Sequence, residues 1–329
     1  MSLTKDQSPF IETSELTKKF DKITAVDKMS FEVDQGESFG FLGPNGAGKT
    51  TTINLLTGLA RPDSGTTRIG GFECTKNPKA AQHLIGVVPD ESNLYPELSG
   101  FDNLCFCAAL YGMPKKVRRT KARELLETFG LAEAADRKFA GYSKGMKRKL
   151  TIAAGIIHNP SVLFLDEPTT GIDVASARNI RQLVKGLHRA GTTIFLTTHY
   201  IEEAERLCDR IAFVVKGRIV GVDTVANLLL PVQGKRVMLF SVSHSDSVLF
   251  GKLAVAFPLL EFCALSDGQF RVESAGPVRI GPLVHFFEEQ GVELLEARHI
   301  HPSLEDVFVR ITGIEAGLMK KEKEKGGGA

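Results

Sequence analysis

Short apolar runs alternate with longer segments of helical periodicity from the N-terminus to about residue 230. The apolar runs predict strands at residues 31–33, 38–42, 162–165, 193–196 and 211–215, the first two joined by a tight turn. Strands that alternate with helices usually form a largely parallel sheet, so we expect an α/β domain. Residues 91–150 break the alternation with helix-like segments, which predicts a helical insertion within this domain.

The pattern changes after Pro231. Helical periodicity at residues 246–257 and 283–290 is flanked by strand-like runs in the order β-α-β-β-α-β, and the hairpin dipeptide Asp267-Gly268 separates the two central strands. This order matches the split βαβ plan of ferredoxin-like domains. We therefore expect an α/β domain at residues 1–230 with a helical subdomain at about 91–150, a small α+β domain of candidate ferredoxin-like topology at 231–315, and a disordered tail at 316–329.

Charge and cysteine content narrow the functional classes. Lys and Arg number 41 against 39 Asp and Glu, and this formal net charge of +2 argues against a nucleic-acid partner. The five scattered cysteines predict reduced thiols in a cytosolic protein rather than a disulfide framework. No apolar run approaches the roughly 20 residues of a transmembrane helix, and the N-terminus lacks the apolar core of a signal peptide.

A glycine-rich segment between a predicted strand and a predicted helix carries the first candidate chemistry. It satisfies the phosphate-binding pattern G-x-x-x-x-G-K-[ST], in which backbone N–H groups and a helix N-terminus surround the phosphates of a nucleotide. Lys49 is expected to reach the β- and γ-phosphates, and the Thr50 hydroxyl is expected to bind Mg²⁺. The predicted nucleotide-binding residues are Gly43, Pro44, Asn45, Gly46, Ala47, Gly48, Lys49, Thr50 and Thr51.

Two later strands end in further candidate catalytic groups. The strand at 162–165 ends in Asp166 and Glu167, as in a Walker B motif, so Asp166 is a candidate Mg²⁺ ligand and Glu167 a candidate base for the attacking water. His199 ends the strand at 193–198. Because ligands bind at the carboxyl edge of such sheets, His199 is expected to contact the γ-phosphate or the catalytic water.

These motifs, in this order, resemble the ATP-binding subunit of ABC (ATP-binding cassette) transporters. Residues 142–146, Tyr-Ser-Lys-Gly-Met, match the family signature at its serine and second glycine, residues 171–173 match the D-loop, and His199 matches the switch histidine. The resemblance implies a P-loop NTPase cassette that hydrolyses ATP with Mg²⁺.

The same resemblance implies that two copies of the chain enclose two ATP molecules. Ser143 and Gly145 would then face the nucleotide held by the second copy, Gly145 allowing close backbone approach, and Asp173 would complete the site. Phe20 matches the aromatic residue that stacks on adenine. Asp90 stands where the family has its Q-loop glutamine, and we expect it to reach Mg²⁺ through a water.

The C-terminal residues indicate a particular group within this family. Residues 304–313 are similar to the end of subunits in the drug, sodium and polysaccharide export group, although Leu304, Val307, Phe308 and Ile311 also suit an ordinary amphipathic helix. The implied protein is an ATPase that powers a separate integral membrane permease, chiefly for export, and lies in the cytoplasm on the inner face of the cell membrane. Two alternatives stay open: an importer subunit with a regulatory C-terminal domain, and a soluble ABC ATPase unconnected with transport.

Overall fold

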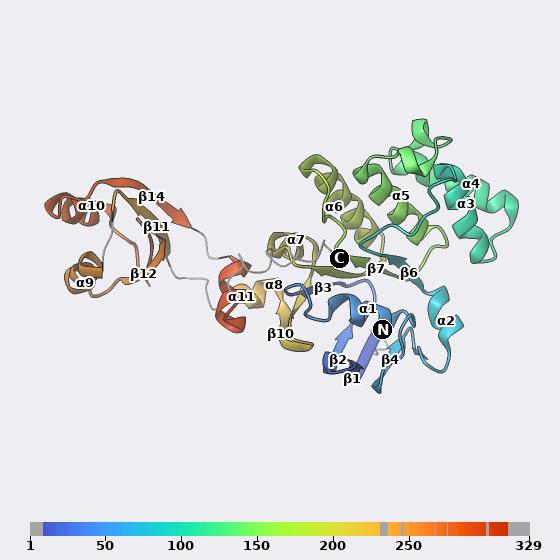
Figure 1. The fold of residues 1–329 in the computed structure, drawn as a ribbon, viewed down its shortest axis with the longest axis horizontal. Coiled ribbons are helices and arrows are strands. Elements are labelled where there is room, and N and C mark those ends of the chain that lie inside the picture. The colour runs from blue at the N-terminus through green and yellow to red at the C-terminus, as the bar shows by residue number, and fades with distance from the viewer. Residues whose placement is uncertain are drawn as a thin grey trace, which may run out of the picture. The chain divides into compact units, whose positions relative to one another are not determined.

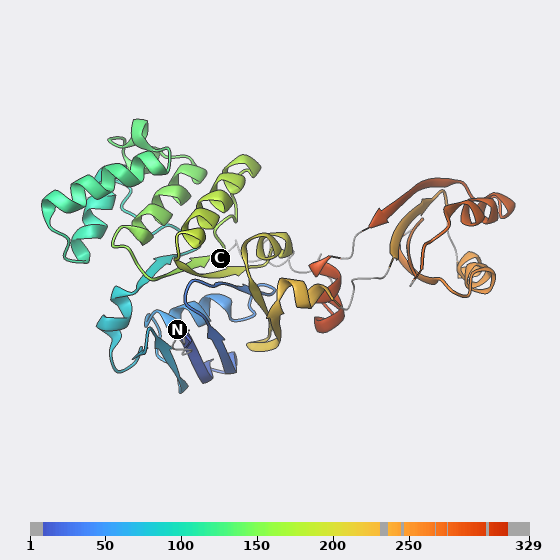
Figure 2. The ribbon, with the colours of Figure 1, turned by 180° about the vertical axis from the view of Figure 1, so that it is seen from behind.

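The computed structural model describes residues 9–230, 236–244, 247–266, 268–274, 276–300 and 303–314. The described residues form two compact units, one made of residues 226–310 and the other of the residues before and after that range (Figures 1 and 2). The expected tail at 316–329 lies outside the described residues. None of the helices in these ranges combines the length and hydrophobicity that crossing a bilayer requires.

A six-stranded sheet forms the centre of the larger unit, with strand order β10-β9-β3-β8-β7-β6. Five of its strands run parallel, and only β10 is antiparallel to its neighbour. The strands are β3 (Ser38–Leu42), β6 (Ile85–Val88), β7 (Val162–Asp166), β8 (Thr193–Thr198), β9 (Arg210–Val215) and β10 (Arg218–Thr224). This sheet confirms the expected α/β class.

A second, antiparallel sheet was not expected from the sequence. Its order is β2-β1-β4-β5, with β1 at Ile11–Phe20, β2 at Ile23–Val33, β4 at Ser64–Ile69 and β5 at Phe72–Glu73. The two strands expected to be joined by a tight turn therefore belong to different sheets, because β2 pairs with β1 whereas β3 pairs with β8 and β9. Buried aromatic rings fill the core shared by the two sheets: the Phe31 and Phe39 rings stack 5.7 Å apart, and Phe41 and Phe195 lie against both.

Helices complete the larger unit. The expected helical insertion is present as α3, α4 and α5, which gather at one end of the unit (Figure 1), together with two short 3₁₀ turns. Three of the remaining helices, α1, α6 and α7, begin just after β3, β7 and β8 and carry the motifs of the site. The helices of this unit are α1 (Lys49–Leu56), α2 (Pro78–His83), α3 (Gly100–Leu110), α4 (Lys115–Thr128), α5 (Lys144–Ile156), α6 (Val174–Arg189) and α7 (Ile201–Leu207). The short helix α8 (Val225–Leu229) begins at the last residue before the smaller unit.

The smaller unit has the expected β-α-β-β-α-β order. Its elements are β11 (Arg236–Val242), α9 (Ser247–Ala256), β12 (Glu261–Ser266), β13 (Gln269–Ser274), α10 (Ile280–Glu289) and β14 (Leu294–Ile300), and α11 (Leu304–Thr312) follows. The antiparallel sheet order β12-β13-β11-β14 is that of a ferredoxin-like fold. A separate core that includes Phe240, Phe270 and Phe287 stabilises it.

Candidate active site

The phosphate-binding loop joins β3 to α1. Its backbone is packed so tightly that a Cβ on Gly43 would lie 2.1 Å from the carbonyl oxygen of Val214, and one on Gly48 would lie 2.2 Å from that of Ala25. Gly48 also has φ +98°, which favours glycine. Gly48 is the N-cap residue of α1, so no side chain caps this helix, and the first turn of α1 holds no acidic residue. The N-terminus of this helix therefore favours an anion.

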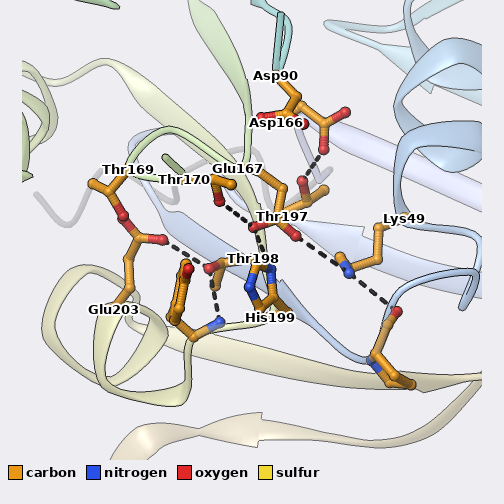
Figure 3. Close-up of polar contacts among 12 residues, drawn as sticks. Lys49, Asp90, Asp166, Glu167, Thr169, Thr170, Thr197, Thr198, His199 and Glu203 are labelled. Carbon is orange, nitrogen blue, oxygen red and sulfur yellow. Dashed lines mark hydrogen bonds and ion pairs between the residues drawn. The ribbon is translucent and has the colours of Figure 1, made fainter. Parts of the chain in front are cut away.

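Lys49 is buried at the start of α1. Its ammonium donates to the carbonyl oxygens of Gly43 (2.7 Å) and Pro44 (3.1 Å), and it forms an ion pair with Glu167 Oε1 at 3.3 Å (Figure 3). The predicted loop lysine and the predicted catalytic carboxylate are thus in contact. The ion pair joins the two motifs across the carboxyl edge of the sheet.

Asp166 ends β7 and is also buried. Thr50 Oγ1 donates to Oδ2 at 2.8 Å, and the Thr197 hydroxyl donates to Oδ1. Burial raises the pKa of Asp166, with the nearby charges of Glu167 and Asp90 adding to the shift and the two hydroxyls opposing it. Its hydrogen-bond partners Thr50 and Thr197 are neutral, so this carboxylate suits a hard cation.

Glu167 follows Asp166 in a left-handed backbone conformation, φ +49°. His199 Nδ1–H donates to Oε2 at 2.7 Å, and Thr170 Oγ1 donates to the same oxygen at 3.1 Å. Burial would raise the pKa of Glu167, but the His199 hydrogen bond and the Lys49 charge outweigh it and lower that pKa. Glu167 is therefore an ionised, hydrogen-bonded carboxylate, as a base for water requires.

Glu203 on α7 is a buried carboxylate that sequence reasoning missed. Thr169 Oγ1 and Thr198 Oγ1 each donate to it at 2.7 Å, so it joins the segment after Glu167 to the residue before His199 (Figure 3). Burial raises its pKa. A glutamate four residues after His199 on a helix looks like a surface residue, and no local sequence signal identifies it.

The signature residues and the D-loop lie at the N-termini of two helices, α5 and α6, that contact each other. Ser143 caps α5, its hydroxyl accepting from Met146 N at 3.2 Å, and Asp173 caps α6, accepting from Ser176 N at 2.9 Å. A Cβ on Gly145 would lie 2.3 Å from Ser176 Oγ and 2.8 Å from Ser176 Cβ. A contact within the chain therefore already requires glycine at 145, besides the close approach expected in the dimer.

The last two predicted site residues, Asp90 and Phe20, have partners other than the Asp166 and Glu167 carboxylates. Asp90 follows β6 and forms an ion pair with Arg148 of α5 at 3.5 Å, a partner that sequence reasoning missed. Phe20 ends β1 with an exposed ring, and the Lys18 ammonium lies 5.4 Å from the ring centroid. An exposed aromatic face is available to a flat ligand.

Several known proteins are similar to this chain in sequence. The family described as ABC transporter matches residues 26–170. The linearmycin resistance ATP-binding protein LnrL of Bacillus subtilis (strain 168) is 41% identical over 307 residues, covering 92% of this chain and 98% of its own. This chain belongs to the ABC transporter family.

Other relatives agree with that assignment to the ABC transporter ATP-binding subunits. The Nod factor export ATP-binding protein I of Paraburkholderia xenovorans (strain LB400) is 38% identical, covering 93% of this chain and 97% of its own. A solved ATP-binding subunit of an ABC transporter has a TM-score of 0.62 at 28% identity, covering 68% of this chain and 93% of its own. A dimeric ATP-binding cassette in a post-hydrolysis state with ADP and phosphate has a TM-score of 0.60 at 26% identity, covering 65% and 98%. The present ABC subunit is accordingly an ATPase that binds ATP.

Proposed function

We propose that this ABC subunit binds Mg²⁺ and ATP between two of its own copies and drives export through a separate integral membrane permease. The observation that carries the proposal is the contact of Lys49, Glu167 and His199 at the phosphate-binding loop. Linearmycin resistance and Nod factor export name the roles of two relatives that match most of the chain, which favours export over import or a function outside transport. Binding to the permease would hold the subunit at the inner face of the membrane.

Each described group has a part in the proposed reaction. The loop amides and Lys49 bind the phosphates, and Phe20 stacks on the adenine. Glu167 accepts the proton of the attacking water, while His199 keeps the carboxylate oriented through its 2.7 Å hydrogen bond. Ser143, Gly145 and Asp173, at the N-termini of α5 and α6, face the nucleotide of the second copy and bring positive helix ends toward its γ-phosphate.

The residues around Asp166 fit a magnesium ion. Thr50 and Asp166 offer a hydroxyl and a carboxylate in direct contact, and Asp90 is close enough for its charge to act on Asp166. Oxygen ligands with retained waters are the usual set for Mg²⁺, so Thr50 and Asp166 would hold the ion and Asp90 would act through a water. Bound there, Mg²⁺ would neutralise charge on the β- and γ-phosphates.

Phosphate release from ATP by the purified chain, with and without Mg²⁺, tests the enzymatic part of the proposal. Purification of the tagged chain from detergent-solubilised membranes, with identification of the proteins that accompany it, tests the permease part. We expect hydrolysis that stops on chelation of Mg²⁺ and a stable complex with a polytopic membrane protein. Metal-independent hydrolysis would contradict the magnesium site, and recovery of the chain on ribosomes or DNA instead would favour the function outside transport.

A further inference from the structure

Arg148 lies in the second turn of α5, five residues after Ser143, and only 7% of its side chain is exposed. Its guanidinium donates to three backbone carbonyl oxygens: Nη1 to Pro89 at 2.5 Å, and Nη2 to Asp90 at 2.5 Å and to Glu167 at 3.4 Å. Nη2 also lies 3.5 Å from the Asp90 carboxylate. One buried side chain therefore joins the signature helix to two other segments of the site.

Those segments follow neighbouring strands. Pro89 and Asp90 come directly after β6, Glu167 comes directly after β7, and the two strands pair in parallel up to Val88 and Leu165. The register of the two strands ends at this pair of residues. The planar fork of Arg148 spans the gap between the two strand ends. Its several donors in fixed directions suit it to hold carbonyl groups of both.

The contact at Glu167 has a specific consequence. A non-glycine residue with φ +49° is held by its surroundings, because that conformation is unfavourable for most side chains. The N–H of Glu167 donates to the Thr197 carbonyl oxygen at 3.0 Å, and the Glu167 carbonyl oxygen accepts from Arg148. The two bonds fix the peptide groups on either side of the Glu167 Cα, and this sets the direction of the carboxylate.

We propose that Arg148 is a positioning residue that couples the segment at Pro89 and Asp90 to the backbone of Glu167. The proposal rests on the proposed function, because it gives Glu167 the role of base. Displacement of the 89–90 segment moves two carbonyl groups and a carboxylate that Arg148 binds, so the guanidinium shifts and its support of Glu167 changes. The position of this loop thereby controls whether the carboxylate is aimed at water.

The first test compares Arg148→Gln and Arg148→Lys with Lys149→Gln, a control one residue further on the same helix. The Lys149 ammonium lies elsewhere, 3.9 Å from where a Cβ of Gly130 would stand. We expect kcat for ATP hydrolysis to fall about tenfold or more in Arg148→Gln, since misplacing a catalytic group by a fraction of an ångström has effects of this order. Arg148→Lys should recover only part of the rate, because an ammonium lacks the fork.

The affinity for a fluorescent ATP analogue separates positioning from folding. The affinity should stay within about twofold of the parent in all three variants, since the hydrogen bonds of Arg148 go to Pro89, Asp90 and Glu167 and not to the phosphate-binding loop. A fall in kcat with retained nucleotide affinity supports the proposal. Unchanged kcat in Arg148→Gln, or equal losses in Lys149→Gln, would overturn it.

Asp90→Asn gives a second measurement, in which the buried Arg148 side chain is left in place. Because 34% of the Asp90 side chain is exposed, this substitution should not prevent folding. It should lower kcat less than Arg148→Gln, and the double variant should lose less than the product of the two single losses. Multiplicative losses in a folded double variant would show that the two residues act independently and overturn the coupling. A parent chain without any Mg²⁺-dependent hydrolysis would instead contradict the proposed function, so the two failures are distinguishable.

Discussion

Three buried carboxylates at the carboxyl edge of the sheet differ in what surrounds them. Glu167 lies against the Lys49 ammonium and a histidine, and its pKa is lowered. Asp166 and Glu203 accept hydrogen bonds from hydroxyls, which compensate burial less than cations do, and their pKa values are raised. The surroundings of each residue thus distinguish the ionised Glu167, which we propose as the base, from Asp166, which we propose as a cation ligand, and from Glu203, which joins two segments of the site.

Replacing the base should separate binding from turnover. In Glu167→Gln, ATP should still bind Lys49 and the loop, but turnover should fall by roughly 10²–10⁴ because the amide cannot accept a proton. Size-exclusion chromatography should then show a dimer that forms only with ATP. Glu202→Gln is the matched control, since Glu202 lies on the surface of α7. Parent-like turnover in Glu167→Gln would remove Glu167 from the mechanism.

Glu203 should affect stability in a pH-dependent manner. A carboxyl whose pKa is raised in the folded state contributes most stability below its unfolded pKa, about 4.5, and loses that contribution as the pH rises through the folded value. Glu203→Gln does not ionise. We therefore expect the stability of the parent relative to Glu203→Gln to decline between pH 4.5 and 8 in urea unfolding. A constant difference across this range would show that Glu203 has an ordinary pKa.

At the scale of elements, α5 and α6 present the signature and the D-loop as one rigid pair. Gly145 of α5 touches Ser176 of α6, and each helix is capped by the motif residue that precedes it. A shift of one helix must therefore move the other motif as well, because side chains in a packed contact cannot interpenetrate.

Gly145→Ala should destabilise the chain by about 1–3 kcal/mol, which is typical of overpacking. The Ser176 hydroxyl can rotate away from the added methyl group, but Ser176 Cβ, 2.8 Å from it, cannot. Adding Ser176→Gly should restore part of the loss, and chemical denaturation measures both. Gly186→Ala on α6 is the control: nothing lies within 4 Å of its Cβ position, so it should not destabilise. Equal effects at 145 and 186 would contradict the packing argument.

At the scale of the whole molecule, the described residues divide into two compact units, and each contains a hydrophobic core of its own. The core residues of the smaller unit come from β11–β14 and the helices between them, and the site residues all belong to the larger unit. We infer that the larger unit carries nucleotide binding by itself.

A chain ending at Leu230 should therefore fold and bind a fluorescent ATP analogue within about threefold of the full chain's affinity, since independent units contribute additively. Its thermal unfolding should remain cooperative. The matched control is the same truncated chain with Lys49→Ala, which should fold but bind weakly. Aggregation of the truncated chain without ATP affinity would place the domain boundary elsewhere.

Local patterns were sufficient for some of this structure and insufficient for the rest. The P-loop, the strand ends at Asp166 and His199 and the β-α-β-β-α-β order follow from short-range sequence periodicity and motif spacing. The antiparallel sheet of β1, β2, β4 and β5 does not, because pairing partners are set by contacts distant in sequence. Arg148 and Glu203 were missed for a related reason: a charged residue on a helix indicates solvent until tertiary packing buries it.

The ion pair between Lys49 and Glu167 links nucleotide binding to the basicity of the Glu167 carboxylate. One ammonium holds the carboxylate at 3.3 Å, and the same ammonium is the group that the phosphates of ATP attract. A nucleotide that draws Lys49 toward itself removes the positive charge of this ammonium, one of the causes that lower the pKa of Glu167. In the proposed mechanism, Lys49 therefore keeps the Glu167 carboxylate a weak base until a nucleotide is bound, and Glu167 becomes a stronger proton acceptor only when ATP is present.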